Sequence, residues 1–271
     1  MRILLLEDES DFASEVMEQI HALFRMAIVT VADSRDQARQ LLADEFFDLL
    51  LLDLRVPTAR GQLDADPVHG LSIFTYARQV APGLPILLLT ASSAEDYIPA
   101  LLRESRITDV WGSGAEISTV NFVKKINLSA LPTALRGLLG PLQALNEVEI
   151  FSPQLILSEP FSRLLKIFSK KFGGARCVVS PLGGGLSGAQ VLRLRVTDEA
   201  GGRVHSAVAK LGPLEEIRDE SRRFDTYVSR LRAEATPRKL ALLEFGAKSS
   251  GGVFYELADN FQGTAFDAAL R

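Results

Sequence analysis

The sequence predicts two folded parts: a doubly wound α/β domain with a five-stranded parallel sheet over residues 1–140, and an α+β domain over residues 158–271. In the first part, short continuous apolar runs alternate with amphipathic stretches, which is the pattern of parallel strands buried on both faces. After residue 158 the rhythm changes, and strand-like segments surround one main helix. Residues 141–157 are expected to be a linker.

The elements of the first part follow from its apolar periodicity. Strands are predicted at 3–6, 27–31, 49–52, 86–89 and 121–124, and helices at 10–24, 34–43, 71–80, 94–105 and 129–139. Ser10 and Ser34 are the predicted N-caps. Gly140 and Pro141 are expected to end the last helix. Two long loops, 57–69 and 107–119, are interpreted as insertions at the rim of the domain.

The second part begins with a predicted helix at 159–172, with Ser158 as its N-cap and Pro160 in its first turn. Strands are predicted at 177–182, 191–196, 204–211, 240–245 and 253–257, around one main helix at 214–231. The order of these elements predicts a mostly antiparallel sheet.

Composition excludes some classes of protein. The 271 residues are 47% hydrophobic and 24% charged, which is the composition of a globular protein. The net charge of -4 does not indicate a nucleic-acid partner, because proteins that bind nucleic acids usually carry a basic surface. Cys177 is the only cysteine, which fits a reducing compartment. No apolar run approaches the ~20 residues that span a bilayer. We therefore expect a cytoplasmic protein with no membrane segment.

Polar residues follow the predicted strands of the first part at one edge of the sheet. Glu7 and Asp8 follow the first strand, Asp53 the third, Thr90 the fourth, and Lys124 and Lys125 the fifth. Taken singly, a carboxylate after a strand is most often a turn or a helix cap. Since ligands of open parallel sheets sit beyond the carboxyl ends of the strands, the joint pattern indicates a site.

Three converging carboxylates repel one another, and a hard divalent cation would remove that conflict. Mg²⁺ takes a few carboxylates and keeps positions for water or phosphate oxygens, so Glu7, Asp8 and Asp53 are its predicted ligands. An aspartate can act as the nucleophile towards a phosphoryl group. A lysine and a threonine hydroxyl can then bind that group.

Residues 1 to about 140 resemble a bacterial response-regulator receiver domain, which has a flavodoxin-like fold. The matching segments are Ile3-Leu4-Leu5-Leu6-Glu7-Asp8-Glu9, Leu49-Leu50-Leu51-Leu52-Asp53-Leu54-Arg55-Val56-Pro57, Leu87-Leu88-Leu89-Thr90-Ala91 and Asn121-Phe122-Val123-Lys124-Lys125.

The resemblance implies Mg²⁺-dependent phosphorylation of Asp53 by a sensor histidine kinase or a phosphotransfer protein. It places Thr90 and Lys125 at the positions that respond to the phosphoryl group, and Phe122 at the position of the switch aromatic. A homodimer formed through the receiver is a further expectation.

One position departs from the family pattern. A proline usually follows the lysine, with a cis bond before it, whereas Ile126 stands here. A non-proline cis bond costs about 2.5–4 kcal/mol, so either the bond is trans and the loop is rearranged, or strain is kept. Lys124 is the alternative to Lys125 as the lysine of the site.

The second part contains a glycine-rich turn, Gly183-Gly184-Gly185-Leu186-Ser187-Gly188, between two predicted strands. Glycines let backbone N–H groups approach a phosphate, but a tight hairpin needs them equally. Lys210 ends a later strand, and Glu220 falls on the apolar face of the following helix. A glutamate on a buried face needs a partner, and Lys210 is the expected one.

Residues of roughly 175–258 resemble the ATP-binding small lobe of aminoglycoside/choline phosphotransferase-type kinases. The resemblance implies a nucleotide site, with ATP as one ligand, at Gly184, Gly185, Ser187, Gly188, Lys210 and Glu220. None of the three histidines lies in a catalytic-loop context, so no phosphotransfer activity is assigned to this half. Either the chain is a piece cut between two lobes, or the lobe is reused without catalysis.

The leading hypothesis is a two-component response regulator that signals through an atypical C-terminal module, and we lean against an enzyme. Two alternatives stay open. One is a receiver-regulated small-molecule or protein kinase whose catalytic lobe is missing from this chain. The other is a pseudo-receiver that serves as an interaction module.

Overall fold

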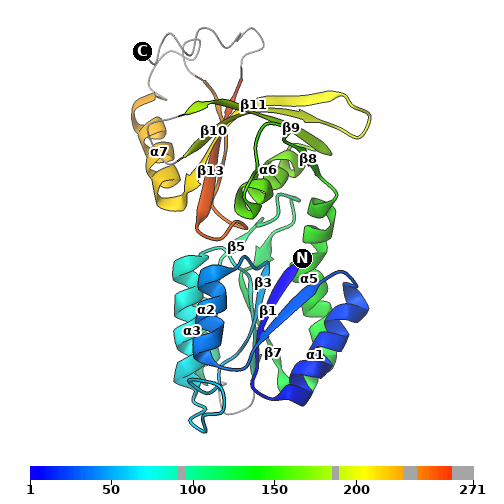
Figure 1. Ribbon diagram of the computed structural model, residues 1–271, viewed down its shortest axis with the longest axis vertical. Helices are drawn as coiled ribbons and strands as arrows, with labels where there is room; N and C mark the ends of the chain where they lie inside the picture. Colours follow the sequence, from blue (N-terminus) through cyan, green and yellow to red (C-terminus); the bar gives the residue numbers. More distant parts are fainter. Residues whose placement is uncertain (91–95, 185–188, 229–236, 258–271) are drawn as a thin grey trace. The chain divides into compact units, whose positions relative to one another are not determined.

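The computed structural model describes residues 1–90, 96–184, 189–228 and 237–257 (Figure 1). The chain divides into two compact units, Met1–Ala144 and Leu145–Arg271. In the described part of the chain, no helix combines the length and the apolar character needed to cross a membrane.

The first unit is built on a five-stranded parallel sheet with the strand order β2-β1-β3-β4-β7. All four neighbouring pairs are parallel, as the apolar runs predicted. The central strands β3 and β4 are buried along their whole length, because helices cover both faces of the sheet. The strands are β1 (Arg2–Leu6), β2 (Ile28–Ala32), β3 (Leu49–Asp53), β4 (Ile86–Thr90) and β7 (Val120–Lys124).

Figure 1 shows α2 and α3 on one face of this sheet and α1 and α5 on the other. The helices of the unit are α1 (Ser10–Leu23), α2 (Arg35–Asp44), α3 (Pro67–Val80), α4 (Ile98–Arg103) and α5 (Leu131–Asn146). Glu9, not the predicted Ser10, occupies the N-cap position of α1. Ser34 does precede α2, but its side chain makes no capping hydrogen bond.

Backbone carbonyls of the loop after β3 take over the capping of α2. The N–H groups of Arg35 and Asp36 donate to the carbonyl oxygens of Pro57 and Thr58, at 2.9 and 3.0 Å. These are two of the N–H groups that a helix N-terminus leaves without an intrahelical acceptor. The loop that follows Asp53 is therefore tied to α2.

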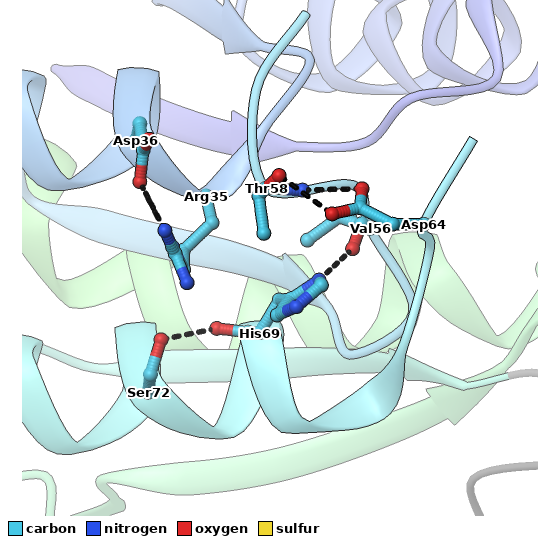
Figure 2. A network of polar contacts seen from close by, with 7 residues as sticks. All are labelled: Arg35, Asp36, Val56, Thr58, Asp64, His69 and Ser72. Carbon is cyan, nitrogen blue, oxygen red and sulfur yellow. Dashed lines mark hydrogen bonds and ion pairs between the residues drawn. The ribbon is translucent and has the colours of Figure 1, made fainter. Parts of the chain in front are cut away.

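The loop predicted at 57–69 is shorter than expected, because α3 already begins at Pro67. Asp66 caps this helix by accepting a hydrogen bond from the N–H of Val68 at 2.8 Å. Within the loop, Thr58 Oγ1 donates to Asp64 at 2.7 Å (Figure 2). His69 Nδ1 lies 2.8 Å from the carbonyl oxygen of Val56. These contacts fix the chain that leaves β3.

The segment predicted as a second loop, 107–119, contains a small antiparallel hairpin of β5 (Ile107–Thr108) and β6 (Ile117–Ser118). Trp111 lies between these strands in sequence and is only 1% exposed. Its indole N–H donates to the carbonyl oxygen of Leu138 in α5 at 2.9 Å. This insertion is therefore part of the core of the first unit.

Helix α5 contradicts one sequence prediction, because it continues through Gly140 and Pro141 to Asn146. A proline inside a helix removes the hydrogen bond of its own missing N–H, and its ring crowds the carbonyl of the residue four positions earlier, at a cost of about 3 kcal/mol. The buried side chains of Leu138, Leu142 and Leu145 favour continuing the helix past this position.

The second unit is a six-stranded sheet with the order β12-β13-β11-β10-β9-β8, antiparallel except for the parallel pair β8–β9. The mostly antiparallel sheet was predicted, whereas the edge strand β8 was not. With the end of α5, β8 occupies part of the expected linker 141–157. The strands are β8 (Glu149–Phe151), β9 (Arg176–Gly184), β10 (Gln190–Thr197), β11 (Arg203–Pro213), β12 (Lys239–Leu243) and β13 (Ser250–Glu256).

Among the described residues of the second unit, two helices accompany this sheet. Helix α6 (Glu159–Lys171) begins after Ser158, which accepts a hydrogen bond from the N–H of Phe161, as its sequence predicts. Its buried Phe168 stacks on Phe254 of β13, with ring centroids 4.2 Å apart. Helix α7 (Leu214–Tyr227) lies between β11 and β12 in the chain and packs against β11 and β13.

Candidate functional site

The first unit gathers polar residues at the edge of the sheet where its parallel strands end. Glu7 and Asp8 follow β1, Asp53 is the last residue of β3, and Thr90 is the last residue of β4. Lys125 follows β7 directly. This is the edge at which open parallel sheets bind their ligands.

Three carboxylates meet at this edge. Glu7, Asp8 and Asp53 each offer an oxygen, and these three oxygens lie within 4.8 Å of one another. Glu7 and Asp53 are buried, and Asp8 is exposed. Burial, followed by the charge of Asp53, raises the pKa of Glu7 to about 7. Burial also raises the pKa of Asp8 and of Asp53, so the cluster disfavours its own full ionisation.

Lys125 is the cation that partly neutralises this cluster. Its Nζ lies 2.8 Å from Asp53 Oδ2 and 2.8 Å from Glu7 Oε2, and its side chain is 13% exposed. Burial lowers the pKa of Lys125, but the Asp53 charge and the hydrogen bonds to both carboxylates outweigh it, and the net shift is upward. Lys125, rather than Lys124, reaches both buried carboxylates.

The lysine reaches the site without a cis bond, since the described chain contains none. Lys125 is the first residue of a 3-10 helix, η2 (Lys125–Ala130), which follows β7 directly. Of the two conformations that the sequence left open for the bond after Lys125, the structure has the trans bond.

Thr90 is 2% exposed, and its Oγ1 has no hydrogen-bond partner among the described residues. A buried hydroxyl without a partner is costly, and an oxygen-rich ligand at this edge would supply an acceptor. Phe122, the predicted switch aromatic, is 42% exposed on β7.

The residues present suit a Mg²⁺ ion. Three carboxylate oxygens within 4.8 Å provide the hard, anionic ligands that Mg²⁺ takes, and the exposed Asp8 leaves one side open to water and phosphate oxygens. A divalent cation there would also favour the ionised form of Glu7, whose pKa is raised to about 7 by burial and by Asp53.

The sequence did not predict two of the groups that lie at this site. The backbone N–H of Arg55 donates to Asp53 Oδ1 at 3.2 Å, which no sequence pattern reveals. The ring of Phe12 lies beside the ammonium group of Lys125, 4.6 Å from Nζ to the ring centroid. An aromatic residue in the first turn of α1 was visible, but its position relative to a lysine 113 residues later was not.

In the second unit, the predicted ion pair is present. Lys210 Nζ donates to Glu220 Oε2 at 2.7 Å, from β11 to α7. Both side chains are partly exposed, at 27% and 37%. Gly184 is the last residue of β9. The other predicted residues of this site, Gly185, Ser187 and Gly188, lie outside the described residues.

Comparison with known protein families identifies two regions. Residues 3–109 match the response regulator receiver domain, and residues 175–269 match ternary complex associated domain 9. The resemblance to a kinase small lobe in the second unit is therefore not confirmed, because another domain family matches there.

Comparison with curated proteins finds a response regulator receiver protein of Anaeromyxobacter sp. (strain Fw109-5), 32% identical over 103 residues. The match covers 38% of this chain and 39% of that protein. The chain thus spans about two fifths of the length of this relative.

Similar solved structures include NtrX from Brucella abortus, at 17% identity and a TM-score of 0.38, covering 60% of this chain and 32% of that chain. Another is the receiver domain of sensor histidine kinase PA1611 from Pseudomonas aeruginosa, which was solved with magnesium in its active-site cleft. It has 20% identity and a TM-score of 0.37, and the match covers 51% of this chain and 97% of that chain. The receiver domain of a putative LuxO repressor from Vibrio parahaemolyticus has 22% identity and a TM-score of 0.39, and the match covers 54% of this chain and 96% of that chain.

The family match and the curated relative agree with the receiver predicted from the ends of the strands. Residues 3–109 of this chain form a response regulator receiver domain.

Proposed function

We propose that this chain is a two-component response regulator whose receiver accepts a phosphoryl group on Asp53 with the help of Mg²⁺. The donor is a sensor histidine kinase or a phosphotransfer protein, and the phosphorylated state is read out through the C-terminal unit. The strongest support is the contact of Lys125 Nζ with both Asp53 and Glu7, next to a third carboxylate, that of Asp8, whose oxygen lies within 4.8 Å of theirs.

Each residue has a role that its position supports. An oxygen of Asp53 forms the new bond to phosphorus as the bond between phosphorus and the donor's nitrogen breaks, and that nitrogen keeps the electron pair. Glu7, Asp8 and Asp53 would hold Mg²⁺, which supplies positive charge for the phosphoryl oxygens. Lys125 provides a second positive charge, and Thr90 Oγ1 provides a hydroxyl donor.

A phosphoryl donor of low molecular mass tests this function without the cognate kinase. With acetyl phosphate and Mg²⁺, we expect the intact mass of the full chain to increase by one phosphoryl group, and we expect EDTA to prevent the increase. Beryllofluoride should bind under the same conditions and require Mg²⁺ equally. A chain that binds Mg²⁺ but gains no phosphoryl group, and binds no beryllofluoride, would instead favour the interaction module.

A nucleotide site in the C-terminal unit is a second proposal, and one specific observation favours it. Lys210 of β11 pairs with Glu220 of α7 at 2.7 Å, and three successive strands β9, β10 and β11 precede that helix. In kinases, a strand lysine paired with a helix glutamate binds the phosphates of ATP. The pair supports nucleotide binding but no phosphotransfer.

Isothermal titration with Mg-ATP tests the second proposal. Wild type is expected to bind, and Lys210→Ala is expected to weaken binding by about tenfold or more, the loss typical of a lysine that contacts phosphate. Lys239→Ala is the matched control, because Lys239 forms a similar ion pair with Asp225 of α7. Absence of binding by wild type, or equal loss in both variants, would rule the site out.

A further inference from the structure

We infer that Phe12 is a positioning residue for Lys125, and that its aromatic face keeps the ammonium group at the phosphoacceptor site. This inference rests on the proposed function of that site. It concerns how this chain holds the lysine when the loop after it carries Ile126 in place of proline.

The contacts of Lys125 Nζ place the ring beside the ammonium group. Nζ lies 2.8 Å from Asp53 Oδ2 and 4.6 Å from the centroid of the Phe12 ring. At 13% exposure, the lysine side chain has little contact with water. An ammonium group has three N–H donors and no acceptor. Two of them donate to Glu7 and Asp53, which leaves one N–H group that still needs a favourable neighbour. An aromatic face within about 6 Å attracts such a cation, most strongly where water is excluded.

The backbone around Lys125 does not by itself hold the lysine side chain in one position. Lys125 starts the 3-10 helix η2, in which Asn127 has non-helical angles of φ -126° and ψ 55°. The lysine side chain is long and flexible, so a loop of this kind does not by itself fix the position of Nζ. Phe12 lies in the first turn of α1, a helix anchored in the core by Ala13 and Val16. The ring is therefore carried by a well-packed element.

The ring should matter most after the carboxylates are neutralised. In the described contacts, Lys125 is held mainly by the charges of Glu7 and Asp53. A divalent cation at the cluster would weaken this attraction, because the same carboxylates would then share their charge with the metal. The attraction of the Phe12 ring does not depend on those carboxylates. It would keep the ammonium group close to the phosphoryl oxygens.

Competitive acylation of the full-length protein with acetic anhydride tests this arrangement without any phosphorylation. The readout is the labelling rate of Lys125 relative to its neighbour Lys124, which serves as an internal reference. Phe12→Leu keeps an apolar side chain but removes the ring, and we expect it to raise this ratio by about tenfold in the presence of Mg²⁺. Phe12→Tyr restores an aromatic face and should leave the ratio within about twofold of wild type.

The labelling ratio and phosphorylation can fail separately. If Phe12→Leu leaves the ratio unchanged, or if Phe12→Tyr raises it as much as Phe12→Leu, the ring does not position the lysine. If wild type gains no phosphoryl group while the ratio behaves as expected, the proposed function fails and the positioning contact stands. Where phosphorylation occurs, its rate with acetyl phosphate should fall about tenfold in Phe12→Leu and recover in Phe12→Tyr.

Discussion

Replacing Asp53 by Asn is expected to abolish phosphorylation of the full chain by acetyl phosphate. The amide has nearly the same shape as the carboxylate but cannot act as the nucleophile that forms an acyl phosphate. Intact-mass analysis with Mg²⁺ measures the effect directly, and the variant should show no added phosphoryl group at times when wild type is fully modified.

The same substitution should leave the fold intact. Asp53 is 4% exposed, and burial raises its pKa, so the ionised form is energetically costly in this position. A neutral amide removes that cost and the repulsion from neighbouring carboxylates, and we expect unchanged or slightly higher thermal stability. Asp36→Asn, at an exposed position in the first turn of α2, is the control and should be phosphorylated like wild type. Phosphoryl incorporation by Asp53→Asn would show that another residue is the acceptor.

Replacing Gly70 by Ala is expected to cost about 3 kcal/mol or more of the free energy of unfolding of the first unit. A Cβ atom at this position of α3 would lie 2.4 Å from Leu54 Cα and 2.5 Å from the carbonyl oxygen of Leu54. Both atoms belong to the backbone, so no side-chain rotation relieves the overlap. Leu54 directly follows Asp53, and any shift that accommodates the methyl group would also displace Asp53.

Urea unfolding followed by tryptophan fluorescence measures this loss. Trp111 is the only tryptophan of the chain and is 1% exposed within the first unit, so it reports on that unit. Gly137→Ala in α5 is the matched control, because its Cβ would meet nothing within 4 Å. Because glycine loses more backbone freedom than alanine when a helix forms, this change should stabilise the first unit by about 0.5–1 kcal/mol. Equal effects of the two substitutions would contradict the close approach of α3 to Leu54.

The core of the first unit could be read from the sequence with good accuracy, because its signal is local. Runs such as Leu49–Leu52 have no polar residue, and a short run of this kind is typical of a strand covered on both faces. Once the strands are parallel, their carboxyl ends share one edge. The meeting of Glu7, Asp8 and Asp53 therefore followed from the order of residues along the chain.

Other features depended on which partner was available in three dimensions. Local rules end a helix at Gly140-Pro141, yet the burial of Leu142 and Leu145 favours its continuation. The strand β8 has only three residues and is stabilised by its pairing with β9, so it carries no periodic signal of its own.

The Lys210–Glu220 pair, by contrast, was predictable from the sequence, because the apolar face of α7 carried a glutamate that needed a cation.

The sequence by itself thus determined the receiver fold and the carboxylate cluster, since both follow from hydrophobic pattern and strand order. Only the tertiary structure decided how the lysine reaches the cluster. Two adjacent lysines and a missing proline left the choice open in the sequence, because the direction of a side chain after a strand depends on the turn that follows. The 3-10 turn at Lys125 and the ring of Phe12, more than a hundred residues earlier, place Nζ against Asp53.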